Sequence, residues 1–225
     1  MNRRKAIWST CLWLTRTTTP STIILPARKR RSTPALYNLE KNPRHPVEVR
    51  KATEADLPGI AALHIQSWRS AYAGILSTEF LGEPLEREFT CYWRDVDLRT
   101  GDVVQVVENG GLCGFIAVWC RPLPYIDNLH VKPSLRSQGI GSTLLISAAE
   151  ELLARGHKTA YLWVFESNQK AVQFYEQLGG VKMEEVPQDI FGHKITSLKI
   201  VWNDLTVITT RLKKPSLDDN GIGSE

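Results

Sequence analysis

Between residues 47 and 202, the apolar positions switch repeatedly between the period of a strand and the period of a helix. Strands are predicted where β-branched and apolar residues alternate or run together, and helices where apolar residues recur every three or four positions. The predicted strands are residues 47–52, 103–108, 112–119, 125–131, 159–164, 181–186 and 195–202. The predicted helices cover residues 54–71, 78–94, 139–155 and 168–178. This order predicts an α/β fold with a mixed, mainly antiparallel sheet and helices on both faces.

Two short signals mark boundaries between these elements. Thr53 and Asp56 have the spacing of a capping box, which predicts the start of the first helix. Asn109-Gly110-Gly111 separates two apolar runs, and this sequence favours a hairpin because glycine and asparagine accept positive φ.

The first 45 residues differ in composition from the rest of the chain. They are rich in Thr, Ser, Arg and Pro, and eight Lys or Arg precede the first acidic residue, Glu40. We expect residues 1–45 to be a disordered basic extension or a targeting-like segment. Three interpretations of this segment remain: a secretory signal, a transit peptide and an extension without a targeting role. The folded domain is expected at residues 46–203. Residues 204–225 carry no core pattern and are expected to form a flexible C-terminal tail.

Composition narrows the classes of function. With 225 residues, 42% of them hydrophobic, the chain has the size of one enzyme domain. From Glu40 onward 20 basic residues stand against 24 acidic ones, so no nucleic-acid surface is expected on the folded domain. No apolar run approaches the roughly 20 residues of a membrane-spanning helix, so we expect no membrane contact and a cytoplasmic location. The four cysteines show no CxxC spacing, and no metal is expected.

A glycine-containing turn between a predicted strand and a predicted helix is the strongest chemical signal. The segment Arg136-Ser137-Gln138-Gly139-Ile140-Gly141-Ser142 brings free backbone N–H groups to a helix N-terminus, which favours binding of phosphate. A P-loop would need a lysine after the glycines, and a dinucleotide-binding fingerprint would need a third glycine where Leu144 stands. Neither nucleotide motif is present.

This turn resembles the Arg/Gln-x-x-Gly-x-Gly/Ala signature of the GNAT superfamily of acyl-CoA-dependent N-acetyltransferases. Residues 162–179 resemble the second motif of that superfamily, and the resemblance covers about residues 47–202. It implies a GNAT-like fold with a splayed pair of parallel strands, 125–131 and 159–164, and an N-acetyltransferase domain that uses acetyl-CoA as donor. A bulge near Asn128 and Leu129 is expected to aim a backbone N–H at the thioester carbonyl.

The resemblance also implies which residues hold the cofactor and which carry the chemistry. Tyr175 stands at the place of the general acid. Tyr125 replaces a glutamate that many members carry, so Asp127 is the candidate base, and a role in ordering the bulge is the alternative. By a period of two, Asp127 is expected to share a strand face with Leu129 and Val131, with His130 pointing away. The expected cofactor-binding residues are Leu129, His130, Val131, Arg136, Ser137, Gln138, Gly139, Ile140, Gly141, Ser142, Asn168 and Ala171.

The acceptor side is encoded less clearly. Trp68, Arg69, Tyr72 and Tyr125 are the expected substrate-binding residues, and Arg69 is a candidate guide for a carboxylate-bearing acceptor. The predicted reaction moves an acetyl group from acetyl-CoA to a primary amine of a small molecule or peptide, by direct attack in a ternary complex. A non-catalytic acyl-CoA sensor is the alternative, and a basic-arm nucleic-acid binder is a second one. A homodimer is left open.

Overall fold

The computed structural model describes residues 48–190 and 193–210, and all of these residues fall in one compact unit. The expectations for residues 1–45 and for residues 211–225 lie outside the described residues. The strands are β1 (Glu48–Lys51), β2 (Val103–Glu108), β3 (Leu112–Trp119), β4 (Tyr125–Val131), β5 (Ala160–Phe165), β6 (Val181–Ile190) and β7 (His193–Trp202). The helices are η2 (Glu54–Asp56), α2 (Leu57–Ala71), α3 (Glu83–Arg94), η3 (Pro133–Leu135), α4 (Ile140–Ala154), α5 (Gln169–Gln177) and α6 (Thr206–Thr210).

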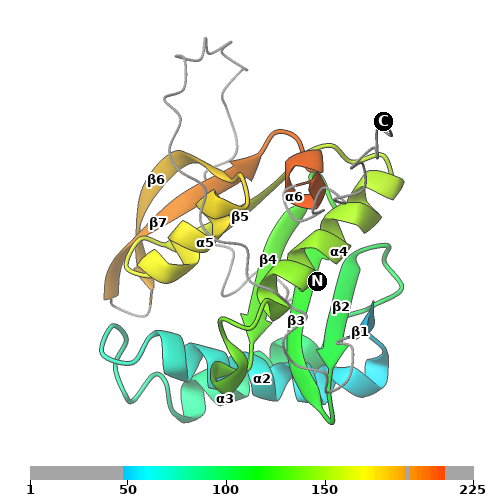
Figure 1. Cartoon of the computed structure of the whole chain (residues 1–225). Helices are drawn as coiled ribbons and strands as arrows, with labels where there is room; N and C mark the ends of the chain where they lie inside the picture. Colours follow the sequence, from blue (N-terminus) through cyan, green and yellow to red (C-terminus); the bar gives the residue numbers. More distant parts are fainter. Residues whose placement is uncertain (1–47, 191–192, 211–225) are drawn as a thin grey trace, which may run out of the picture. The chain divides into compact units, whose positions relative to one another are not determined.

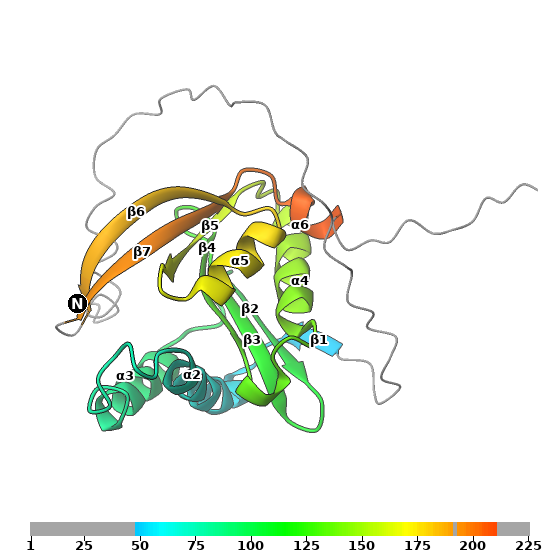
Figure 2. The same cartoon turned by 60° about the vertical axis from the view of Figure 1, so that its left-hand side comes forward.

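The seven strands form one sheet in the order β1-β2-β3-β4-β5-β7-β6 (Figure 1). Every neighbouring pair is antiparallel except β4 and β5, which are parallel. Helices α2 and α3 lie on one side of the sheet, and α4 and α5 lie on the other (Figure 2). The prediction of a mixed, mainly antiparallel sheet with helices on both faces is confirmed.

Local sequence signals explain several boundaries. The Asp56 carboxylate accepts hydrogen bonds from the backbone N–H of Thr53 at 2.7 Å and from its hydroxyl at 2.8 Å, so the predicted helix start is present. The second helix begins at Glu83, five residues later than predicted. None of the helices in the described ranges has the length and apolar character needed to cross a membrane.

Strands β4 and β5 diverge immediately after they meet. Their only registered pair is Tyr125 with Tyr161, and the backbone N–H of Tyr161 donates to the carbonyl of Pro124 at 3.1 Å. Beyond that pair β4 continues along β3, and β5 continues along β7. The predicted splayed pair of parallel strands is therefore present, and its open end faces the chain segments that lead into α4 and α5.

A bulge in β4 overturns the expected alternation of its side chains. Ala117 pairs with Asn128 and Val118 pairs with Ile126, so Asp127 is the extra residue. Leu129 and Val131 pack against the core on the α4 side, whereas Asp127 contacts helix α3. His130 contacts helix α2 on that same side. Asp127 therefore shares its face with His130 and not with Leu129 and Val131, which corrects the prediction made from a period of two.

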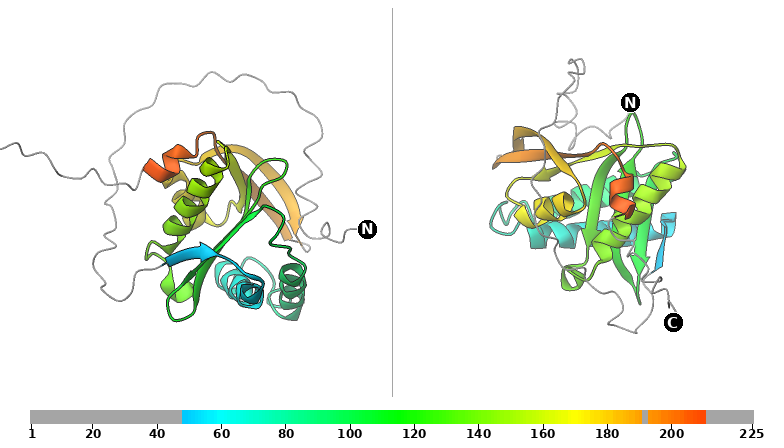
Figure 3. Two further views of the ribbon diagram at one scale, coloured as in Figure 1. Left: turned by 90° about the vertical axis from the view of Figure 1, so that its right-hand side faces the viewer. Right: turned by 45° about the horizontal axis from the view of Figure 1, so that its top comes forward.

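The C-terminal boundary also differs from the prediction at Asn203. Helix α6 lies beside α4 (Figure 3). Leu205 and Ile208 are both 0% exposed and belong to the core on that side of the sheet. The packed part of the chain therefore extends to Ile208, because two apolar side chains three positions apart anchor this short helix.

Candidate active site

The glycine-containing turn has the backbone geometry of an anion site. Ser137 has a φ of 63°, and Gly139, the N-cap of α4, has a φ of 84°. Left-handed residues at alternate positions turn successive N–H groups toward one side, and the first turn of a helix adds further unpaired N–H groups. Ser137 and Gln138 are exposed, and Ser142 is half-buried. The turn can therefore receive a phosphate group from solvent.

Gly141 provides a clean test of this turn. An added Cβ would lie 3.5 Å from the Phe174 ring and 3.8 Å from Val131, which are ordinary contacts. We expect Gly141→Ala to fold as stably as the parent chain, since alanine favours a helix over glycine by about 1 kcal/mol. The signature Arg/Gln-x-x-Gly-x-Gly/Ala allows alanine at this position, so Gly141→Ala is the matched control and should keep its coenzyme A affinity. The larger side chain of Gly141→Leu has no room against Phe174 and Val131 and would crowd the N–H groups, so its affinity should fall about 10- to 100-fold. Calorimetric titration and thermal unfolding measure affinity and stability, and unchanged affinity in Gly141→Leu would contradict the placement.

The edge of β4 that faces β5 carries the backbone groups of Leu129 and Val131. The N–H of Lys132 donates to the carbonyl of Cys113 at 2.8 Å, on the β3 side. Because backbone groups alternate between the two edges of a strand, those of Leu129 and Val131 point toward β5. These groups have no β5 partner in the described part of the chain. An extended ligand can pair with them as an added strand would.

His130 is placed elsewhere, which corrects its expected role in holding the cofactor. The same alternation turns its backbone groups toward β3. Its Nδ1 lies 2.9 Å from the hydroxyl of Ser67 on α2. Burial, and then the charge of Arg136, lower the pKa of His130 to about 3, so the ring is neutral at physiological pH.

Arg136 rests on α2 in this structure. Its guanidinium donates to the hydroxyl of Ser70 at 3.1 Å and to that of Ser67 at 3.2 Å. Burial lowers the pKa of Arg136 from its usual value. The cation lies near the C-terminal half of α2, where the helix dipole favours positive charge. It therefore connects the glycine-containing turn with α2.

Three polar side chains meet where β5 leads into α5. The Asn168 carbonyl oxygen accepts from the backbone N–H of Ala171 at 3.3 Å, so Asn168 caps α5. Its amide is hydrogen-bonded to Tyr72, whose pKa burial raises to about 12. Burial and the nearby Tyr72 raise the pKa of Tyr175, which is 9% exposed. Tyr175 is therefore a neutral phenol that can donate a proton or a hydrogen bond.

Asp127 lies inside a set of hydrogen-bond donors. One carboxylate oxygen accepts from the Tyr92 hydroxyl at 2.8 Å and from the Asn128 amide at 2.6 Å. Trp119 and Tyr125 also donate to this carboxylate. Burial raises the pKa of Asp127, and the four donors oppose that rise without cancelling it. A carboxylate with a raised pKa is better matched to accept a proton near neutral pH.

The residues expected on the acceptor side lie in different surroundings. Trp68 is 6% exposed and packs edge-on against Tyr72, Phe89 and Phe165. Tyr125 lies half-buried beside Asp127. Arg69 is a correction: its guanidinium holds the carbonyl of Leu81 at 2.8 Å, that of Gly82 at 3.1 Å and the Glu86 carboxylate at 3.1 Å. It joins α2 to the start of α3 and does not lie beside Asp127 and its hydrogen-bond donors.

Sequence reasoning missed Tyr92 and the role of the Asn128 side chain. Tyr92 lies 35 positions before Asp127, and nothing in its local pattern connects it with β4. Asn128 is 2% exposed, and its side-chain oxygen has no hydrogen-bond partner among the described residues. An asparagine next to an aspartate in a strand is a signal that could have pointed to this pair, since both residue types are unfavourable in strands.

The arrangement agrees with comparisons to known proteins. YuaI of Bacillus subtilis, an uncharacterized N-acetyltransferase, is 29% identical over 174 residues, covering 75% of this chain and 99% of that protein. Thialysine N-epsilon-acetyltransferase of Sus scrofa is 38% identical over 76 residues, covering 33% of this chain and 45% of that protein. Spermidine N(1)-acetyltransferase of Thermoplasma acidophilum is 25% identical over 146 residues, covering 62% and 90%.

The fold is shared with PaiA N-acetyltransferase of Thermoplasma acidophilum, solved in complex with coenzyme A, with a TM-score of 0.55 and 22% identity. That match covers 69% of this chain and 98% of the other. The sequence model of the acetyltransferase (GNAT) family matches residues 64–180, just over half of the chain. The protein belongs to the acetyltransferase (GNAT) family, which makes it an acyltransferase.

Proposed function

We propose that this protein transfers an acetyl group from acetyl-CoA to a primary amine of a small molecule or peptide, by direct attack in a ternary complex. The observation that carries the proposal is the single β4–β5 pair, which leaves two strand edges open beside an N–H-rich turn. Relatives named for acetylating thialysine and spermidine support a small amine as acceptor.

The donor has three groups of contacts in this proposal. The backbone of Ser137–Ser142 receives the pyrophosphate, since its N–H groups converge there. The free edge at Leu129 and Val131 pairs with the pantetheine arm, and the Leu129 N–H stabilises the oxyanion that forms on the thioester carbonyl. Asn168 and the small Ala171 line the same gap from α5, where Ala171 leaves room for the donor.

Asp127 accepts the proton that the acceptor amine must lose. An alkyl amine with a pKa near 10 is protonated at neutral pH and must lose a proton before its nitrogen can attack. The Asp127 carboxylate takes that proton directly or through one water. Tyr92 and Asn128 hold the carboxylate oxygen in place at 2.8 and 2.6 Å, which fixes the direction from which the amine is deprotonated.

Tyr175 acts on the thiolate that leaves when the acetyl group is transferred. When the amine nitrogen has bonded to the carbonyl carbon, the carbon–sulfur bond breaks and a thiolate leaves. A thiol has a pKa of about 8.5, whereas burial raises the pKa of Tyr175 above that of an ordinary phenol. The Tyr175 hydroxyl therefore stabilises the thiolate chiefly by donating a hydrogen bond, and the thiol proton comes finally from solvent.

Direct transfer is favoured over an acyl-enzyme on a cysteine. Cys113 is buried in β3, and its thiol donates to the carbonyl of Gly111 at 3.3 Å. Burial raises the pKa of Cys120, which keeps the thiol protonated and weakens it as a nucleophile.

The proposal is tested by mixing the purified chain with acetyl-CoA and a panel of primary amines. Thiol release that depends on the amine, together with a mass increase of the amine by one acetyl group, is the expected result. Tight coenzyme binding without release of thiol for any amine would favour the non-catalytic sensor and overturn the proposal.

The hydroxyl of Tyr92 should influence the pH dependence of the reaction. Its hydrogen bond stabilises the charged form of Asp127 and so lowers the pKa of that carboxyl. We expect Tyr92→Phe to raise the pKa of Asp127. The acidic limb of the kcat/KM profile, where activity is lost as Asp127 becomes protonated, should therefore move to higher pH. A profile identical to that of the parent chain would contradict this role for Tyr92.

A further inference from the structure

Beyond Asp127, the face of the sheet that carries the site continues as a row of aromatic rings. Tyr125 stacks on Tyr161, with ring centroids 5.1 Å apart and planes at 24°. Tyr161 and Trp163 follow one another on the same face of β5, and both are half-buried. The two rings extend about 7 Å along the strand, because alternate residues of a strand are separated by about twice 3.3 Å.

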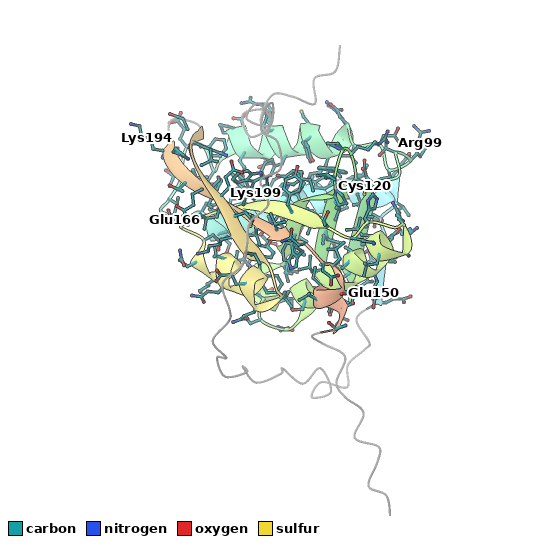
Figure 4. The ribbon with its side chains drawn as sticks, turned by 90° about the horizontal axis from the view of Figure 1, so that it is seen from above. Arg99, Cys120, Glu150, Glu166, Lys194 and Lys199 are labelled. Carbon is teal, nitrogen blue, oxygen red and sulfur yellow. The ribbon has the colours of Figure 1, made fainter. Side chains whose placement is uncertain are left out.

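Lys199 lies over two rings of this row, Tyr161 and Trp163. Its ammonium is 5.2 Å from the centre of the Tyr161 ring and 5.7 Å from that of the Trp163 ring. Only 25% of its side chain is exposed. Lys199 is the direct cross-strand partner of Trp163, which fixes its side chain on this face. Figure 4 shows Lys199 near the middle of the view, whereas Lys194 lies at its margin.

A bulge in β6 brings a carboxylate to the same ammonium. Lys182 pairs with Ile200 and Glu184 pairs with Lys199, so Met183 is the extra residue. Without the bulge, Met183 would stand opposite Lys199. The Glu184 carboxylate lies 3.6 Å from the Lys199 ammonium and is 49% exposed. This distance exceeds that of a charge-assisted hydrogen bond, about 2.8 Å, so the two charges attract without being locked together.

We propose that Lys199 and Glu184 form a subsite for the two charges of an amino-acid-type acceptor, whose side-chain amine is the group acetylated. The proposal rests on the function proposed above and names the acceptor class for the same site. Lys199 would bind the α-carboxylate and Glu184 the α-ammonium. The aliphatic chain of the acceptor would run from Lys199 across the rings of Tyr161 and Tyr125. Its far amine would reach Asp127.

Lys199 also supplies discrimination against simple diamines. A diamine of the same length lacks the carboxylate and presents a second cation where the amino acid presents both charges. That cation can still pair with Glu184, but the diamine has no carboxylate for Lys199, whose positive charge then repels the nearby cation and disfavours the diamine. The subsite thus separates amines that bear a carboxylate from polyamines, which the Asp127 group alone would not do.

The experiment compares kcat/KM for lysine and for 1,5-diaminopentane, which differ by the carboxylate alone. Four proteins are measured: the parent chain, Lys199→Gln, Lys199→Glu and, as a matched control, Lys194→Gln on the same strand. We expect the parent chain to prefer lysine. In Lys199→Gln, kcat/KM for lysine should fall about 10-fold or more, whereas kcat/KM for the diamine should change little. Lys199→Glu should favour the diamine, and Lys194→Gln should match the parent chain.

Other outcomes separate the two proposals. A parent chain that prefers the diamine, or a Lys199→Gln variant that keeps the lysine preference, overturns the subsite while acetyl transfer stands. An equal loss for both amines in Lys199→Gln also overturns it, since a merely structural lysine would act in that way. Absence of amine-dependent thiol release across the whole panel overturns the proposed function itself.

Discussion

Replacing Asp127 by asparagine is expected to lower kcat by about 10²- to 10⁴-fold, the usual contribution of a positioned proton acceptor. The amide keeps an oxygen that can accept from Tyr92 and from Asn128, so the bulge should persist. It cannot take a proton from the attacking amine. Steady-state kinetics with saturating acetyl-CoA and a reactive amine measure the effect.

Two controls test whether this loss of kcat comes from proton transfer. Coenzyme A affinity should stay within about 3-fold of the parent value, a difference well below 1.4 kcal/mol, because Asp127 does not line the phosphate turn. Glu150→Gln, an exposed change on α4 (Figure 4), should leave kcat unchanged. An Asp127→Asn variant that keeps most of its activity would mean that Asp127 orders the bulge and that another group accepts the proton.

Replacing Tyr175 by phenylalanine should lower kcat by about 10- to 100-fold, the value of one hydrogen bond to a charged group. The ring of Tyr175 packs edge-on against Trp202, with centroids 5.9 Å apart, and phenylalanine keeps this contact. Stability should therefore change little, whereas the departing thiolate loses its donor. The kinetic loss should shrink for a thioester with a more acidic thiol, because such a thiolate needs less stabilisation. Equal losses for both thioesters would argue against this role.

Much of the fold could be predicted from the sequence because each element carries its own local signal. The runs at β2, β3 and β4 coincide with their predicted limits, since hairpin and loop residues punctuate them on both sides. The glycine-containing turn before α4 was also predictable, because glycine accepts the positive φ that Gly139, the N-cap of this helix, adopts.

The details of the candidate site were less accessible. A bulge adds one residue to a strand without leaving a strong mark in the hydrophobic pattern, so the faces of Asp127 and His130 could not be assigned by alternation. The contact between Tyr92 and Asp127 joins residues from α3 and β4, and such a pairing depends on how the helix packs. The sequence could not reveal the partners of Arg69, because the carbonyls of Leu81 and Gly82 are backbone groups that leave no side-chain pattern.

The central claim is that coenzyme A binds between β4 and β5 and over the turn that begins α4. Hydrogen–deuterium exchange of the whole chain, with and without coenzyme A, tests it most directly. Peptides covering Leu129–Val131 and Ser137–Ser142 should become protected, because their N–H groups gain partners, while peptides from β1 and β2 should exchange unchanged. Protection confined to other segments, or no protection at saturating coenzyme A, would contradict the claim.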